Sequence, residues 1–296
     1  MDASIFIQIA LGGILLGGLY AMVAFGLSLI YGVARILNFA HGTLLAVGGV
    51  AASAIFAATA WNPLLIMALL VPVFGIFGYV FYDKLLQPLT KRSHFEYTVG
   101  SVLVTVGALL ILSDVAAWIA GPAPRNIPLR FEAMEFGDVI VSTTQVWILG
   151  GIIVFTTILH FYIKKSWFGR AMRAVTQDHT GATICGVQAD RVHALTFAFG
   201  SGIVAIAAVL YTMLFPVDPY MGFSLTVKAF TIIILGGIGN LVGALVAGIF
   251  LGLAEGFTSF FWATQWAPAI SIVLLLVILV ICLLYTSDAA DEVDRV

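Results

Sequence analysis

The chain has very little charge. Only 9% of its 296 residues are Asp, Glu, Lys or Arg, whereas 61% are hydrophobic, and its mean hydropathy is +1.11. So few polar residues could not cover the surface of a water-soluble domain. The formal net charge of −2 also argues against a nucleic-acid partner, which would require a basic surface. The composition therefore indicates an integral membrane protein.

Residues and motifs that would mark an enzyme are also scarce. The two cysteines, Cys185 and Cys282, lie too far apart for a disulfide framework or a metal site. No G-x-x-x-x-G-K motif is present, and the glycines from Gly236 to Gly243 miss the G-x-G-x-x-G spacing by one residue. We identify no H-E-x-x-H motif and no paired catalytic carboxylates. We therefore expect no catalysis, no metal and no cofactor, and no ATP binding by this chain itself.

Long apolar runs fill most of the sequence, and each can cross ~30 Å of hydrocarbon as a helix. The first run follows an acidic residue, where a cleavable signal would be basic, so we expect it to be retained. The seventh and eighth runs are separated only by "LGGIGNLVGA" and could form one broken or re-entrant element. The sequence predicts an all-α, polytopic helical bundle with eight or nine membrane-embedded segments, near residues 5–33, 37–60, 64–83, 97–120, 144–163, 192–214, 225–239, 242–261 and 267–285.

The thirteen Lys and Arg residues are unevenly distributed between the connections, and such residues favour the cytoplasmic side. An external amino terminus leaves three of them outside: Arg125, Arg130 and Lys228. It places the other ten inside: Arg35, Lys84, Lys91, Arg92, Lys164, Lys165, Arg170, Arg173, Arg191 and Arg295. The bias predicts this orientation, with a cytoplasmic carboxyl terminus if there are nine crossings and an external one if there are eight.

Two connections are long. Residues 121–143 hold three prolines and three acids, and we expect an external loop with a short strand or an interfacial piece. Residues 164–191 form the longest cytoplasmic insertion. The insertion should contain a short amphipathic helix, because four apolar side chains recur at helical spacing: Phe168, Ala171, Met172 and Val175. That apolar face could rest on the membrane surface or dock in a groove of a partner, and spacing does not choose between these.

Small residues follow one face of each of the first two runs. In the first run they are Gly13, Gly17, Ala21, Ala24, Ser28 and Gly32. In the second they are Gly42, Ala46, Gly49, Ser53 and Ala57. In lipid no hydrophobic force draws helices together, so such faces indicate helices whose backbones approach closely.

Polar residues gather at the start of the second run. Arg35 and Asn38 continue the face that leads to Gly42, so we expect both on the second helix, pointing into the bundle. His41 lies deeper, and it either makes an ordinary internal contact or lines a pathway. Two carboxylates within later apolar runs are hypotheses for buried polar sites that could pair with a hydroxyl or a backbone group: Asp114 and Glu255.

Three stretches together resemble one known family. They are "GLYAMVAFGLSLIYGVARILNFAHGTLLAVGG", "GRAMRAVTQDHTGATICGVQADRVHALTFAFGSGIVAIAAVLYT" and "KAFTIIILGGIGNLVGALVAGIFLGLAEGF". The chain is similar, over most of residues 5–285, to the permease subunits of branched-chain amino-acid ABC importers, specifically the smaller of the two permeases. The resemblance implies a multi-pass permease in a prokaryotic inner membrane, with four kinds of contact: a second permease, two cytoplasmic ATP-binding subunits that use ATP, an external solute-binding protein, and membrane lipid.

The resemblance also implies roles for parts of this sequence. The permease domain would be residues 1–285, and the acidic tail at 286–296 would lie outside the family fold. The insertion would couple to the ATPases through Gly169, Arg170, Arg173, Ala182 and Gly186. Candidates for the translocation path are Asn38, His41, Gly42 and Glu255. A helix break that could act in gating is expected at Gly236, Gly237 and Gly239.

The substrate stays open at this point. The family often has an acidic residue where this chain has Thr43, and related permeases with these motifs carry urea or short amides as well as leucine, isoleucine and valine. A secondary transporter is a weaker alternative, because it would require ion-coupling carboxylates within the membrane and detectable repeats.

Overall fold

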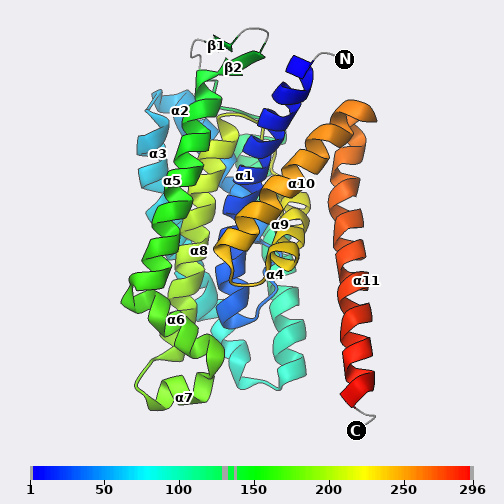
Figure 1. Cartoon of the computed structure of the whole chain (residues 1–296). Helices are drawn as coiled ribbons and strands as arrows, with labels where there is room; N and C mark the ends of the chain where they lie inside the picture. The colour runs from blue at the N-terminus through cyan, green and yellow to red at the C-terminus, as the bar shows by residue number, and fades with distance from the viewer. Residues whose placement is uncertain (1–2, 129–132, 137–138, 294–296) are drawn as a thin grey trace.

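A computed structural model describes residues 3–128, 133–136 and 139–293, which form an almost entirely helical bundle (Figure 1). Its helices are α1 (Ala3–Ala34), α2 (His41–Thr59), α3 (Pro63–Phe81), the turns η1 (Tyr82–Leu86) and η2 (Gln87–Lys91), α4 (His94–Ala120), α5 (Thr143–Lys165), α6 (Trp167–Gln177), α7 (His179–Ile184), α8 (Ala189–Thr212), α9 (Gly222–Gly236), α10 (Leu241–Phe261), η3 (Thr264–Trp266) and α11 (Ala267–Val293). Arg130 and Arg295, which the charge distribution above includes, lie outside the described residues.

Seven helices in the described part of the chain are long and apolar enough to cross a membrane: α1, α2, α3 with its continuation to Lys91, α4, α5, α8 and α10. Two further apolar helices, at 222–236 and 264–280, are shorter. The expected all-α, polytopic class is confirmed. A short antiparallel hairpin of β1 (Ala133–Phe136) and β2 (Val139–Ser142) lies in the 121–143 connection, so the strand expected there is present.

The bundle has two distinct ends. The β-hairpin and the start of α1 lie at one end, which we call the hairpin end (Figure 1). Helices α6 and α7 of the 164–191 insertion lie at the other, which we call the insertion end, and α11 runs down to that end as well. The charge prediction is wrong for Lys228, which lies within α9 and is buried rather than in an external connection.

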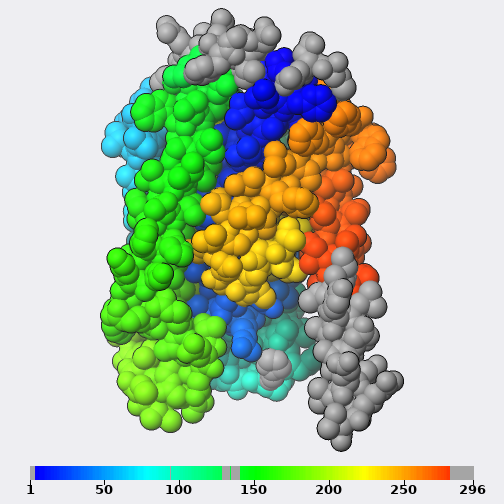
Figure 2. Space-filling view, viewed as in Figure 1, coloured from blue at the N-terminus to red at the C-terminus, as the bar shows by residue number. Residues whose placement is uncertain are grey.

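Helix α1 is the axis of the bundle. Both α1 and α8 are mostly buried, whereas α3, α4 and α5 expose most of their length. In the space-filling view α10 crosses in front of α1, with α5 on one side and α11 on the other (Figure 2). A membrane protein exposes apolar side chains to lipid, so the outer helices carry many of them, including Trp118 and Leu103 on α4.

The small-residue face of α1 is where α10 packs. A methyl group added to Gly17 would overlap the Gly248 carbonyl oxygen, and one added to Gly252 would overlap the Gly13 carbonyl oxygen. The two backbones are therefore in direct contact, as small-residue pairs allow in membranes. The close helix packing expected from the sequence is confirmed for α1, and its partner is α10.

Helix ends follow local chemistry. Ser93 and Glu96 form a reciprocal capping box at the start of α4, which satisfies two of its free N–H groups. The side chain of Asn240 accepts a hydrogen bond from Gly243 N–H and starts α10. Gly237 and Gly239 both have positive φ, at 88° and 79°, which few other residues adopt. The chain is therefore broken here between α9 and α10, which are two separate helices rather than one bent helix, while a role of the break in gating stays a prediction.

The expectation that Arg35 and Asn38 belong to the second helix is wrong. Helix α2 begins at His41, and residues 35–40 form an irregular connection. Arg35 has φ 51°, in the left-handed region, and this ends α1. The side chain of Asn38 accepts a hydrogen bond from Ala40 N–H, a local turn that competes with helix formation. The second helix therefore starts four residues after the predicted position at 37.

Substitution in α1 should distinguish the α10 contact from general helix stability. We expect Gly17→Ala to lower the thermal unfolding temperature of the purified protein in detergent, because overpacking costs about 1–3 kcal/mol. Gly12→Ala is the matched control on the same helix, since a methyl group there meets nothing within 4 Å. Equal stability of the two variants would contradict the close contact.

Candidate functional site

The starts of α2 and α9 meet inside the bundle. His41 Nε2 lies 3.1 Å from the carbonyl oxygen of Val23, which is roughly 16 Å from the insertion end of α1 at 1.5 Å per residue. The N–H of Gly42 donates to Thr226 Oγ1 of α9 at 2.9 Å. We call residues 38–43 and 222–226 the junction. Two helices thus begin well inside the protein, as in the broken helices of membrane transporters.

The junction is tightly packed. A methyl group on Gly42 would overlap the Gly222 carbonyl oxygen, and one on Gly222 would overlap the Thr43 side chain. The Thr226 hydroxyl lies 3.0 Å from the carbonyl oxygen of Phe39 and also bonds within its own helix. His41 and Thr43 are fully buried. The starts of α2 and α9 are therefore in direct contact at the junction.

Unsatisfied polar atoms gather at the junction. His41 Nδ1 and Thr43 Oγ1 are buried and have no hydrogen-bond partner among the residues that the structure describes. Asn38 is also buried, although its side-chain oxygen bonds to Ala40 N–H. Buried polar atoms usually have partners, and helix starts carry partial positive charge. The described conformation therefore leaves hydrogen bonds of His41 and Thr43 unmade at the junction.

A buried ion pair joins four helices a short way from the junction. Lys228 Nζ of α9 lies 2.8 Å from Glu255 Oε2 of α10, and the two residues are 7% and 2% exposed. The Tyr20 hydroxyl of α1 donates to the same oxygen at 3.0 Å, and Ser271 Oγ of α11 donates to Oε1 at 2.6 Å. Lys228 also donates to Tyr20, at 2.6 Å. Every charged group in this cluster has a partner.

The contacts of Glu255 in this cluster can be compared with the prediction from the sequence. The prediction of a buried polar site that pairs with hydroxyl groups is confirmed for this residue, while its role in a translocation path stays a prediction. Lys228 was missed as its partner, although a lysine between apolar residues in a membrane helix is itself a signal, because such a charge needs an internal partner. The 27 residues that separate the two give no periodicity that links them.

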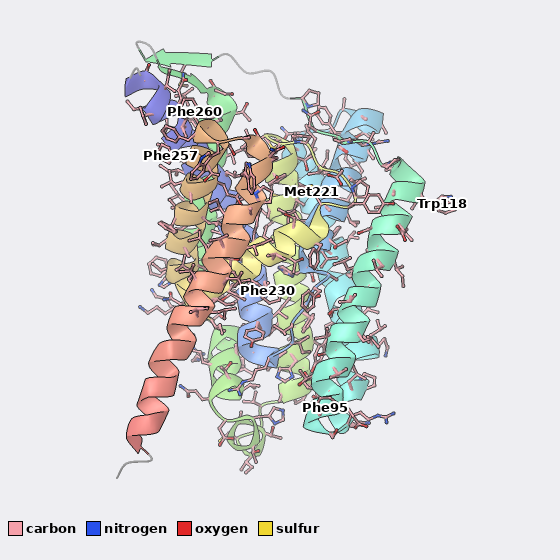
Figure 3. The ribbon with its side chains drawn as sticks, turned by 90° about the vertical axis from the view of Figure 1, so that its right-hand side faces the viewer. Phe95, Trp118, Met221, Phe230, Phe257 and Phe260 are labelled. Carbon is pink, nitrogen blue, oxygen red and sulfur yellow. The ribbon has the colours of Figure 1, made fainter. Side chains whose placement is uncertain are left out.

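Asp114 behaves differently. It is exposed rather than buried, so the prediction of a buried site is wrong, but it does pair with a hydroxyl: Tyr220 O–H donates to it at 3.3 Å. Asp114 lies near the hairpin end of α4, close to the connection that leads into α9. Figure 3 shows this face, with Met221 and Phe230 of the α9 region between α4 and α11.

The apolar face predicted for the insertion is real, and the bundle itself covers it. Ala171, Met172 and Val175 are buried in the main hydrophobic cluster, and Phe168 packs against its edge. The sequence left two roles open for this face, docking in a partner or resting on the membrane surface. Because the face is buried in the bundle, it serves neither role. The polar side of α6 and the helix α7 remain exposed at the insertion end.

Two arginines fix α6 to the end of α5. Arg173 donates to the carbonyl oxygens of Ile163 and Lys164 at 2.8 and 3.2 Å, and Arg170 donates to that of Lys165 at 2.9 Å. These are the last carbonyl groups of α5, which lack partners within the helix and attract cations. Gly169 lies against the same end, where a methyl group would overlap the Ile163 carbonyl oxygen. α5 and α6 are therefore held as one rigid unit.

The remaining insertion residues shape α7. Ala182 is buried, and Gly186 follows the helix with φ 85°. A cavity of about 390 Å³ separates α6 from the α9–α10 turn, with Arg173, Gly239 and Asn240 among its lining residues. The structure therefore brings the insertion and the glycine break to opposite walls of one space, while Asn38, His41 and Gly42 lie together in the junction.

A double-mutant cycle can measure how the pairing of Lys228 with Glu255 contributes to the stability of the folded protein. We expect Lys228→Met alone to destabilise the purified protein by about 3–5 kcal/mol, because it leaves Glu255 buried without a countercharge. Adding Glu255→Met to that variant should restore much of the loss, since two apolar groups of similar size need no partner. Thermal unfolding in detergent measures both. A double variant less stable than Lys228→Met would contradict this account.

The chain is similar in sequence to proteins of one transport family. Residues 9–283 match the family described as "Branched-chain amino acid transport system / permease component". The high-affinity branched-chain amino acid transport system permease protein LivH of Escherichia coli (strain K12) is 30% identical over 81% of each chain. BraD of Pseudomonas aeruginosa, with the same description, is 28% identical over 81% of each chain.

More distant likenesses extend the comparison. The probable branched-chain amino acid transport permease protein LivH of Methanocaldococcus jannaschii is 24% identical and covers 79% of this chain and 75% of its own. The solved structure of PsaBC from Streptococcus pneumoniae in complex with Fab aligns over 92% of this chain and 90% of that one, at 13% identity and a TM-score of 0.48. The family match and the identity to LivH confirm the resemblance seen in the sequence: the chain belongs to the family of permease components of branched-chain amino acid transport systems.

Proposed function

We propose that this chain is the membrane-spanning permease subunit of an ATP-driven importer of branched-chain amino acids. The observation that carries the proposal is the family match over residues 9–283, supported by relatives named for branched-chain amino acid transport. The sequence holds no G-x-x-x-x-G-K motif, so ATP would be used by two partner ATPase subunits. A second permease would complete the path, and an external solute-binding protein would deliver the amino acid.

The proposed topology has nine membrane-embedded segments, with the shorter α9 and α11 added to the seven long helices. The amino terminus would be external, and the insertion would face the cytoplasm of a prokaryotic cell with the permease in its inner membrane. One observation supports an odd number of crossings, and a second supports the orientation. α1 starts and α11 ends at opposite ends of the bundle (Figure 1). The burial of Lys228 removes one of the cations assigned outside and so strengthens the positive bias toward the insertion end.

The insertion would receive the movement that the ATPase subunits generate. The exposed helix α7 and the polar side of α6 would rest on an ATPase subunit, and ATP-driven closure of the ATPases would displace them. Because Arg173 and Gly169 hold α6 firmly against α5, that displacement would move α5 as well. The 390 Å³ space between α6 and the Gly236–Asn240 turn leaves room for a rigid-body rearrangement.

The translocation path would run beside the junction. Opening would separate the starts of α2 and α9 and expose Asn38, His41 and Gly42, which the described conformation buries. His41 Nδ1 and the free N–H groups of the two helix starts could then meet the polar end of an amino acid. Glu255, neutralised by Lys228, would hold the helices around this opening rather than bind a coupling ion. This favours an ABC importer over a secondary transporter.

Uptake by the assembled complex tests the substrate. Proteoliposomes that contain both permeases and both ATPases, with the binding protein outside and ATP inside, should accumulate radiolabelled leucine but not urea. Omission of ATP or of the binding protein is the control and should abolish accumulation. Accumulation of urea in place of leucine would support the amide alternative and overturn the proposed substrate.

Gly186 offers a test of coupling through α7. Its positive φ costs a residue with a side chain about 1–2 kcal/mol, and more for a β-branched one. Gly186→Val should therefore reorient α7 and lower uptake and substrate-stimulated ATP hydrolysis together. Gly186→Asn is the matched control, because Asn tolerates this conformation and nothing lies within 4 Å of the added carbon. Full ATPase stimulation and uptake in the Val variant would refute a docking role.

A further inference from the structure

A second cavity, of about 620 Å³, lies at the insertion end and is separate from the junction. Its walls come from four places in the chain: the end of α1, the turn η2 with the start of α4, the α6–α7 turn, and the start of α8. Both the helix that leads to the junction and the coupling insertion therefore border one space. A molecule bound there would touch moving and static parts of the bundle at once.

Two guanidinium groups line this cavity. Arg35 ends α1 in the left-handed conformation, and Arg92 follows η2. Both side chains are exposed, and neither donates a hydrogen bond to another residue in the described ranges, although Arg92 is close enough to Glu96 to interact with it electrostatically. Guanidinium groups bind carboxylates through paired, charge-assisted hydrogen bonds, so two of them in one cavity favour an anionic group.

His193 provides a buried polar atom at the same place. It is 8% exposed and lines the cavity, and its Nδ1 lies 2.9 Å from the Tyr82 hydroxyl. Its Nε2, on the other edge of the ring, is buried without a partner in the part of the chain that the structure describes. Buried polar atoms are rarely left unsatisfied, so an unmet hydrogen bond lies within the wall of the cavity.

The rest of the lining complements the other parts of an amino acid. Asp178 supplies a carboxylate, one oxygen of which accepts a hydrogen bond from Thr180 N–H, while the other lies beside Gly181. Val33 and Val175 supply an aliphatic wall. A cavity with cationic, anionic and aliphatic sides matches a zwitterion with a branched aliphatic side chain better than it matches a simple anion.

We propose that this cavity is an exit site that binds the imported α-amino acid, with Arg35 and Arg92 at its carboxylate and Asp178 at its ammonium group. The assignment rests on the proposed function, which sends the substrate toward the insertion end. Since the α6–α7 turn forms one wall, occupancy of the exit site would connect substrate release to the position of the coupling insertion.

Equilibrium binding can test the exit site directly. The probe is radiolabelled leucine, added to the assembled permease–ATPase complex in detergent without binding protein or ATP. We expect Arg35→Gln and Arg92→Gln each to weaken binding about tenfold, the effect of losing one charge-assisted hydrogen bond of about 1.5 kcal/mol. Lys91→Gln is the matched control, an exposed cation beside Arg92 that does not line the cavity, and it should bind leucine like the unmodified complex.

Competitors separate an amino-acid site from a general anion site. Leucinamide, which lacks the carboxylate, and 4-methyl-2-oxopentanoate, which lacks the ammonium group, should both compete more weakly than leucine. Inorganic phosphate that competes as well as leucine would overturn the proposal, as would unchanged leucine binding in an Arg35→Gln/Arg92→Gln double variant that retains its unfolding temperature. If leucine is taken up by proteoliposomes but does not bind here, the exit site is refuted while the proposed function stands; if the complex does not take up leucine, the proposed function itself fails.

Discussion

Direct backbone contact between α1 and α10 is the constraint on which the rest of the bundle depends. In lipid, apolar side chains gain nothing by leaving hydrocarbon for one another, so helices associate through close van der Waals contact and internal polar bonds. Gly13 and Gly17 give α1 a flat surface on which Gly248 and Gly252 of α10 lie. This contact makes α1 the axis, and it brings α10 near enough for Glu255 to reach Tyr20.

The polar interactions of the interior follow from that arrangement. Glu255 and Lys228 can be buried inside the bundle because their charges pair with each other. Glu255 also accepts hydrogen bonds from the hydroxyl groups of Tyr20 and Ser271. The cluster ties α9 to α1, α10 and α11 at one point. Further along α9, the Thr231 hydroxyl donates to the Ser271 carbonyl oxygen of α11, so the short helix is held at more than one position. The buried ion pair and its hydroxyl partners thus lie next to the junction, where the starts of α2 and α9 meet.

The insertion end combines a firmly attached helix, α6, with cavities beside it. α6 buries its apolar face in the bundle and is fixed by Arg170 and Arg173 to the last carbonyl groups of α5, so it moves with that helix. Cavities border this unit toward the glycine turn and toward Arg35. Firm attachment to α5 together with neighbouring free space is compatible with the rigid-body movement proposed above.

Local features of the sequence determined a large part of this picture. Composition and run length predicted a helical membrane protein, the 3.6-residue period predicted the apolar face of α6, and Gly237 and Gly239 predicted the break before α10, because each depends only on neighbouring residues. Three motif stretches were enough to identify the family. The small residues of α1 predicted a close contact but not its partner.

Only the tertiary structure decided the rest. It starts α2 at His41 because the irregular backbone before it is held from elsewhere: Thr105 of α4 donates to the Leu37 carbonyl oxygen, and Thr226 bonds to that of Phe39. It pairs Lys228 with Glu255 and turns the apolar face of α6 inward. These outcomes depend on contacts between residues far apart in the chain, and no local period encodes which distant segment will supply a hydrogen bond or a countercharge.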